Sequence, residues 1–264
     1  RSIQDDIMSY TTIVFEKKEN TGLVKLNRPD VLNAMNRRMW RELRAVLDRA
    51  AEDPEIKVLV FTGEGRAFSS GADLKESKTR SLSEYRSYLE SVQKVSRRIL
   101  QFEKPTIAAI NGYALGSGYE LALACDIRIA AFEAVIGSPE AKVTSSVTGG
   151  AFRLIQDLVG PGKASELLFT ARNIDGKEAE RIGLVNFSVP LEKLVEEAVH
   201  LAEKIAENSA FSIARMKKGL LMAREGAGLD ALMAYEIEAC LACVSTGERQ
   251  DSLESFEKRK KDNA

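Results

Sequence analysis

KPTIAAINGYALGSGYELALACDIRIAAFEAVIGSPE is the sequence of residues 104–140, and it decides how the rest of the chain is interpreted. It opens with an apolar, β-branched run at residues 106–110, bounded by Pro105 and Gly112, which predicts a buried strand. Small residues follow, and residues 119–125 are rich in alanine and leucine, which predicts a short buried helix. We therefore expect a strand that feeds a glycine turn, which in turn opens a helix.

The glycine turn is a candidate for stabilising negative charge. The first turn of a helix has unpaired N–H groups and a partial positive charge, which favour an anion or an oxygen that is becoming one. Gly116 and Ser117 lie in this turn, and Glu120 follows within the predicted first helical turn. Glu140 comes after the next apolar runs, next to Pro139. Glu120 and Glu140 are thus predicted to handle protons and water, because a carboxylate in an apolar segment is costly unless it is partnered or used. Ordinary complementation of the helix dipole is the alternative role for Glu120.

Composition restricts the class of protein. The 264 residues predict one large domain, or one domain with an appendage, and 44% of them are hydrophobic, enough for a substantial core. A net charge of −1 gives no global attraction to nucleic acid or to an anionic membrane. No apolar run is long enough to predict a membrane-spanning helix, and the polar first residues do not resemble a signal peptide. Met8 is a possible natural start.

Cysteine and histidine usage narrows the chemistry. Three cysteines, an odd number, predict a reducing, cytoplasmic setting. Cys240 and Cys243 form a C-x-x-C within a helical pattern, where core packing is favoured over a redox role. His200 is the only histidine, so a serine–histidine–aspartate triad or a histidine-based zinc site is not expected. Glu, Asp, Tyr or Lys must then perform acid–base chemistry, and we expect no metal.

The order of elements predicts an α/β fold. Two strands are expected at residues 11–17 and 22–26, paired as a hairpin, and Asn36 is expected to cap a helix that runs to about residue 52. The continuous apolar run 56–62 is typical of a parallel strand covered on both faces. Further helices are expected at residues 81–101, 151–159, 162–169, 176–182 and 191–207, and a further strand at residues 184–189. After residue 207 the pattern is almost entirely helical. We therefore divide the chain into an α/β body at residues 8–207 and a helical region at residues 208–264, whose apolar surface packs either on another subunit or within the chain.

Two loops rich in small residues accompany the central stretch. Residues 63–75, GEGRAFSSGADLK, follow a buried strand, and residues 144–150, TSSVTGG, precede a helix. Loops without large side chains bring backbone N–H groups close to a ligand, although a surface loop has the same composition. Neither loop nor the glycine turn matches a nucleotide-binding fingerprint.

Five motifs in order resemble the enoyl-CoA hydratase/isomerase (crotonase) superfamily, and the resemblance covers nearly the whole chain. They are LNRP with LNAM at residues 26–35, FSSGADLK at residues 68–75, NGYALGSGYEL at residues 111–121, SPE at residues 138–140 and FEKRK at residues 256–260. The resemblance implies a spiral of ββα units followed by a C-terminal helical trimerisation region. A homotrimer or a dimer of trimers is expected.

The resemblance also implies site residues. The backbone N–H groups of Ala72 and Ser117 would form an oxyanion hole for a thioester oxygen. Glu120 and Glu140 match both family glutamates, which favours hydration. The CoA path would be lined by residues that the family motifs contain, namely Leu32, Ala34, Ala72, Asp73, Leu74, Lys75, Gly116 and Phe256.

The implied reaction is reversible addition of water across the 2,3 double bond of an enoyl-CoA, as in fatty acid β-oxidation. Coenzyme A is then part of the substrate, no separate cofactor is needed, and neither nucleic acid nor a membrane is an expected partner. The alternatives are another reaction of the superfamily, such as double-bond isomerisation or hydration of a cyclic or aromatic acyl-CoA, and a non-catalytic acyl-CoA-binding protein. Ser117 stands where glycine is common in the family, and the loop after Glu140 departs from many relatives, so the acyl group is left open.

Overall fold

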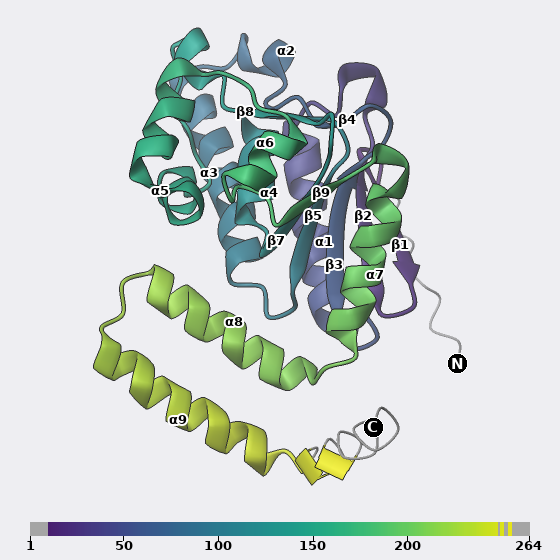
Figure 1. Cartoon of the computed structure of the whole chain (residues 1–264). Coiled ribbons are helices and arrows are strands. Elements are labelled where there is room, and N and C mark those ends of the chain that lie inside the picture. Colours follow the sequence, from purple (N-terminus) through teal and green to yellow (C-terminus); the bar gives the residue numbers. More distant parts are fainter. Residues whose placement is uncertain (1–9, 248, 251–252, 255–264) are drawn as a thin grey trace. The chain divides into compact units, whose positions relative to one another are not determined.

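The computed structural model describes residues 10–247, 249–250 and 253–254 (Figure 1). The chain divides into two compact units between Glu207 and Asn208. The first unit contains both sheets, and the elements described in the second are helices.

A six-stranded sheet forms the centre of the first unit. Its order is β1 (Ile13–Lys18), β2 (Thr21–Leu26), β3 (Val58–Gly63), β5 (Thr106–Ile110), β7 (Ile127–Ala131) and β9 (Phe187–Val189). The predicted hairpin is confirmed, because β1 and β2 are antiparallel, and all other neighbours are parallel. Every residue of β5 is buried, as expected of a strand covered on both faces.

A second, three-stranded parallel sheet consists of β4 (Ala67–Ser69), β6 (Tyr113–Leu115) and β8 (Val135–Gly137). Each of its strands follows a strand of the larger sheet, so the chain alternates between the two sheets as it winds. This is the expected spiral of ββα units. The treatment of the β4 and β6 segments as loop and turn was wrong. Strands of three residues carry too little periodicity to be recognised, and they exist because they pair with partners remote in sequence.

Glycines allow the sharp crossing from one sheet to the other. A Cβ on Gly63 would lie 1.9 Å from the carbonyl oxygen of Ala67, and a Cβ on Gly112 would lie 2.2 Å from that of Arg66. No side chain fits at either position, because real Cβ atoms do not approach backbone this closely. The glycines at the end of β3 and after β5 therefore fix where the strands of the small sheet begin.

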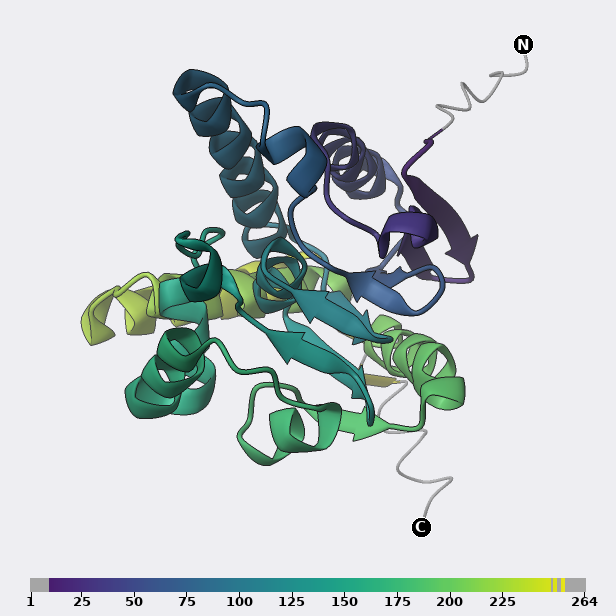
Figure 2. The same ribbon diagram turned by 90° about the horizontal axis from the view of Figure 1, so that it is seen from above.

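Helices enclose the sheets. In the first unit they are α1 (Arg37–Glu52), α2 (Leu74–Ser77), α3 (Leu82–Leu100), α4 (Ser117–Ala124), α5 (Ala151–Thr170), α6 (Gly176–Arg181) and α7 (Leu194–Ala206), with 3-10 turns η1 (Pro29–Val31), η2 (Glu140–Val143) and η3 (Leu191–Lys193). Helix α7 packs against β3, β5 and β7 of the six-stranded sheet (Figure 1). Helices α1 and α3 lie side by side (Figure 2).

Local capping explains where these helices begin. The Asn36 side chain accepts a hydrogen bond of 2.9 Å from the Met39 N–H, as predicted for the start of α1. Helix α4 begins at Ser117, two residues before the predicted start, because Gly116 adopts a positive φ of 50° and turns the chain there. The break predicted between two helices after residue 159 is the non-helical Gly160 inside α5.

The second unit contains α8 (Ala210–Arg224) and α9 (Leu229–Ser245), which pack on each other. They leave an apolar groove of about 720 Å³. Its lining includes Met216, Leu220, Tyr235 and Cys240. Both predicted cysteines lie within α9, but core packing was wrong for this chain, since Cys240 is exposed and Cys243 is half-buried. None of the helices in the described residues combines the length and apolar character that crossing a bilayer requires.

Asn33 holds the loop after β2 against the turn after β3. Its fully buried side chain accepts a hydrogen bond from the Arg28 N–H at 2.8 Å and donates to the carbonyl oxygens of Glu64 and Ala67 at 2.9 and 2.7 Å. Its φ is 55°, a left-handed conformation that asparagine tolerates better than most residues.

The substitution Asn33→Ala should lower the free energy of unfolding by roughly 2–4 kcal/mol, because it leaves buried backbone groups unpaired in a strained conformation. Chemical denaturation measures this loss. Asn27→Ala is the matched control, since among the described residues the Asn27 side chain makes no hydrogen bond. Equal stability of the two variants would contradict the role given to Asn33.

Candidate active site

The small sheet gathers the predicted site residues at one edge. Ala72 follows β4, Ser117 and Glu120 follow β6, and Glu140 follows β8. Because these strands are parallel and adjacent, the segments that leave their carboxyl ends emerge on the same side. The sheet topology thus explains how residues from three turns of the spiral come together.

The turns that contain Ala72 and Ser117 are in close contact. A Cβ on Gly71, whose φ is +96°, would lie 2.8 Å from the carbonyl oxygen of Leu115 and 3.5 Å from the Ser117 nitrogen. Only glycine permits this approach. Within the described residues, neither the Ala72 N–H nor the Ser117 N–H donates a hydrogen bond to the protein. Two adjacent backbone donors are therefore available to a ligand.

Glu120 is a buried carboxylate in the first turn of α4, with an exposed fraction of 2%. It accepts hydrogen bonds of 2.5 Å from both the N–H and the hydroxyl of Thr148. Burial raises the pKa of Glu120 to about 7, the Thr148 hydrogen bonds oppose the rise, and the charge of Glu140 adds to it. A carboxyl with a pKa near neutrality is poised to exchange protons.

Glu140 lies at the start of η2 and faces the same turn. Its Oε1 would be 2.8 Å from a Cβ on Gly116, the residue that caps α4. Its other oxygen, Oε2, accepts a hydrogen bond from the Ser138 hydroxyl. The structure thus brings the Glu140 carboxylate to the amino-terminal end of α4, where Glu120 also resides.

Asp73 is held by the protein itself. Its carboxylate pairs with the Arg28 guanidinium at 2.8 Å and accepts hydrogen bonds from the N–H groups of Lys75 and Glu76, which caps α2. These contacts hold the pKa of Asp73 below its ordinary value despite the opposing effect of its burial. The Asp73 carboxylate therefore caps α2 and pairs with Arg28. If Asp73 lines the CoA path as predicted, its backbone is the part that would contact the substrate.

The other residues predicted to bind substrate differ in exposure. Leu74 and Lys75 are exposed, Leu32 is half-buried and Ala34 is buried. Residues 32–35 run alongside residues 70–73 through hydrogen bonds such as Ser70 N–H to Leu32 O at 2.9 Å. Leu32, Ala34 and Ala72 therefore border one another. Phe256 lies outside the described residues, as does the motif that contains it.

Several site contacts were not predicted from the sequence. Thr148 and Ser138 bind the two glutamates, and Tyr88 of α3 lies beside Ser117. The small-residue loop at 144–150 was recognised as a feature, but nothing in its sequence identifies Thr148 as the partner of Glu120. Tyr88 stands within an ordinary amphipathic helix pattern, so only the tertiary structure reveals its position.

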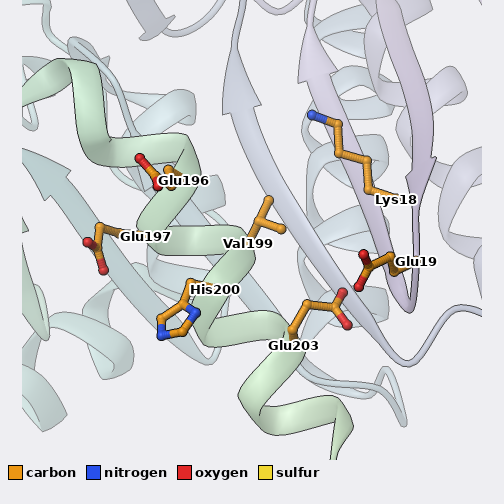
Figure 3. A pocket seen from close by; sticks show the side chains of 7 residues that line it. All are labelled: Lys18, Glu19, Glu196, Glu197, Val199, His200 and Glu203. Atoms are coloured by element: carbon orange, nitrogen blue, oxygen red, sulfur yellow. The ribbon is translucent and has the colours of Figure 1, made fainter.

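His200 belongs to a different pocket. Five α7 residues, Glu196, Glu197, Val199, His200 and Glu203, line it together with Lys18 at the end of β1 and Glu19 in the turn that follows (Figure 3). None of the predicted site residues is among those that line this pocket.

Comparisons with known proteins identify the family. The family model described as enoyl-CoA hydratase/isomerase matches residues 16–263. The chain is 38% identical to a short-chain-enoyl-CoA hydratase of Clostridium acetobutylicum, covering 96% of this chain and 97% of the relative. It is 36% identical to a crotonyl-CoA hydratase of Syntrophomonas wolfei, covering 97% and 98%.

Comparison with a solved structure also supports this family for the fold. An enoyl-CoA hydratase from Bacillus anthracis superposes with a TM-score of 0.91 at 33% identity, covering 94% of this chain and 97% of that one. Similarity of sequence and of structure therefore extends over nearly the whole chain. With two carboxylates and two free backbone donors at one edge of the small sheet, the chain belongs to the enoyl-CoA hydratase/isomerase (crotonase) family and is an enoyl-CoA hydratase-like enzyme.

Proposed function

We propose that this enzyme adds water reversibly across the 2,3 double bond of a short, straight-chain 2-enoyl-CoA. The main support for the proposal is that Glu120 and Glu140 both lie near the free N–H groups of Ala72 and Ser117. The names of the relatives, short-chain-enoyl-CoA hydratase and crotonyl-CoA hydratase, support a short acyl chain.

The Ala72 and Ser117 N–H groups would receive the thioester oxygen. Addition of water to C3 moves negative charge onto this oxygen and forms an enolate-like state. Donors aimed at the developing charge stabilise it, and one such donor is typically worth about 3–4 kcal/mol. The position of Ser117 at the start of α4 adds the favourable dipole of that helix.

Glu120 and Glu140 would divide the proton transfers. Glu120, ionised, orients the water and accepts its proton as the oxygen bonds to C3. Glu140 supplies the proton that C2 gains. In this division one carboxyl must be ionised and the other protonated, and the raised pKa of Glu120 suits proton exchange near neutral pH. No metal or separate cofactor takes part in the proposed reaction.

We further propose that the chain assembles as a trimer, or a dimer of trimers, through its second unit. Within that unit, apolar side chains such as Leu220, Met233, Ile237 and Leu241 are exposed. Burying such a surface against other copies is favourable. Sedimentation velocity tests the assembly, and a monomer at micromolar concentration would contradict it.

The pH dependence of kcat/KM tests the role of Glu120. Because the ionised form of Glu120 is needed, the rising limb of the profile of kcat/KM against pH should be centred at about 7, where the pKa of Glu120 lies. Thr148→Val removes a hydrogen bond that favours the ionised form, so it should move this rise to higher pH. A rise centred near the ordinary value of 4.5 in the wild-type enzyme would contradict the assignment.

A turnover screen over enoyl-CoA thioesters tests the function itself. The panel contains crotonyl-CoA, longer straight chains, branched chains and cinnamoyl-CoA, and each product is analysed by mass. Hydration removes the ultraviolet absorbance of the enoyl thioester and adds the mass of water. Isomerisation leaves the mass unchanged. A product of unchanged mass, or no turnover of any thioester, would overturn the proposal.

A further inference from the structure

The Tyr88 side chain, from α3, is linked to the segments that contain the Ala72 and Ser117 N–H groups. It is 3% exposed, and its phenol oxygen accepts a hydrogen bond of 3.3 Å from the indole N–H of Trp40. Its hydroxyl donates to the carbonyl oxygen of Met35 at 3.4 Å. The Ser117 hydroxyl interacts with the same phenol oxygen. One hydroxyl therefore connects α1, α3, the segment before α1 and the first turn of α4.

Met35 links Tyr88 to Ala72. Its N–H donates to the Gly71 oxygen at 2.8 Å, and its oxygen accepts from the Asp73 N–H at 3.2 Å. Met35 and Ala72 are thus paired as in a parallel sheet, and the two bonds use the groups on either side of the Ala72 N–H. The Gly71 oxygen and the Ala72 N–H belong to one planar peptide group, so the bond from the Met35 N–H sets the direction of the Ala72 N–H, and the hydrogen bond from Tyr88 holds Met35 in place.

Ser117 is the other end of the connection. It carries the second free N–H at the first residue of α4. The Ser117 hydroxyl lies near the Tyr88 phenol, where α3 and α4 pack on each other. This proximity gives Tyr88 a second route to the backbone donors, beside its hydrogen bond to Met35.

Arg80 holds the Tyr88 ring in place. Its guanidinium carbon lies 3.8 Å from the centre of the ring, and its side chain is 5% exposed. The guanidinium is anchored by Glu76, whose carboxylate accepts a hydrogen bond from its Nη2 at 2.7 Å. Glu76 also accepts from the Arg37 N–H at the start of α1. A buried cation over the ring face restrains the orientation of the Tyr88 ring.

We propose that Tyr88 is a positioning residue that sets the separation and direction of the Ala72 and Ser117 N–H groups, a role that rests on the proposed function. It does not touch the substrate. Donors to a developing oxyanion lose effect when displaced by a fraction of an ångström, so a clamp on both is a direct influence on turnover.

Tyr88→Phe is the test, because it keeps the ring under Arg80 and removes only the hydroxyl. We expect kcat for crotonyl-CoA to fall about 10- to 100-fold, less than the 10²- to 10³-fold typical of a lost donor, with KM changed less than about threefold. The matched control is Tyr85→Phe on the same helix. Tyr85 stacks on Tyr88 with ring centroids 6.3 Å apart, and within the described residues its hydroxyl makes no hydrogen bond.

A spectroscopic readout separates positioning from loss of structure. A dimethylaminocinnamoyl thioester of CoA absorbs at longer wavelength when its carbonyl is polarised by hydrogen-bond donors. We expect binding to shift the absorbance to the red in the wild-type enzyme and in Tyr85→Phe, and to shift it less in Tyr88→Phe. The pH at which kcat/KM rises should be the same in all three, because Glu120 keeps its contacts.

Ser117→Ala keeps the N–H and removes the hydroxyl, so it should weaken the same connection. Combined with Tyr88→Phe it should cost less than the sum of the two single losses, since both break one linkage. If Tyr88→Phe does not fold, Trp40→Phe, which removes the donor to the phenol, takes its place.

The two hypotheses fail in different ways. Wild-type kcat and a full red shift in Tyr88→Phe would overturn the positioning role alone. A wild-type enzyme that binds the thioester without a red shift would overturn the proposed oxyanion hole. A wild-type enzyme with a red shift but no hydration of any thioester would overturn only the proposed reaction, and the shift in Tyr88→Phe would still decide the role of Tyr88.

Discussion

Replacing Glu140 with glutamine, Glu140→Gln, is expected to lower kcat by roughly 10²- to 10⁴-fold while acyl-CoA binding is retained. Glutamine has nearly the same shape, so it fits against Gly116 and still accepts the hydrogen bond from Ser138. It has no acidic proton for C2. The loss should therefore appear in the chemical step and not in the affinity for substrate.

Steady-state hydration of crotonyl-CoA measures kcat, and calorimetric titration with saturated butyryl-CoA measures binding. Glu133→Gln is the matched control, since it makes the same change at an exposed position in the turn between β7 and β8. Turnover by Glu140→Gln within about threefold of the wild-type value would refute proton transfer by this residue.

Glu120→Gln is expected to abolish most turnover and at the same time to stabilise the folded protein above neutral pH. In the folded chain the pKa of Glu120 is raised to about 7 from an ordinary value of 4.5. Below pH 4.5 the Glu120 carboxyl is protonated in both the folded and the unfolded chain, so its pKa shift does not lower the free energy of unfolding. As pH rises from 4.5 to 7 the unfolded chain loses this proton while the folded chain keeps it, so stability falls. Above pH 7 the accumulated loss of folding free energy is about 3–4 kcal/mol.

Glutamine avoids this cost because it never ionises, and its amide can satisfy both groups of Thr148. The midpoint of thermal unfolding should therefore rise in Glu120→Gln at pH 8 and match the wild-type value closely at pH 4.5, if both proteins remain folded there. Glu133→Gln provides the baseline at each pH. If Glu120→Gln changed the midpoint of thermal unfolding equally at both pH values, the ionised Glu120 carboxylate would not be destabilising the folded protein, and the proposed rise in its pKa would be wrong.

The elements that the sequence predicted are those with a strong local signal. The buried run that forms β5 is continuous and apolar, and Asn36 marks the start of α1 by its own hydrogen bond. The strands β4 and β6 have no such signal, since three residues of mixed character are strands only because the opposite strand is present. The prediction that Cys240 packs in the core was wrong for a related reason. An apolar helix face in a sequence does not show whether other parts of the same chain cover that face.

The same distinction holds for the site. Glu120 and the turn at Gly116 and Ser117 were recognisable because glycines beside an acid in an apolar segment are unusual. Thr148 and Tyr88 were not, because each reaches the site from an element remote in sequence through a single hydroxyl. Asp73 was assigned to the CoA path by its motif, but its carboxylate is held by Arg28 and α2, which only coordinates reveal.

The three-stranded sheet has a consequence for how such enzymes diversify. Its strands deliver residues 70–75, 116–120 and 138–148 to one edge, while the six-stranded sheet and its helices carry the fold. Apart from glycines such as Gly71 and Gly116, these segments can therefore change side chains with less disturbance to the framework that bears them. The family description names both hydratases and isomerases. A fold that separates its framework from the segments around the site would allow such different activities to arise by changes in one loop at a time.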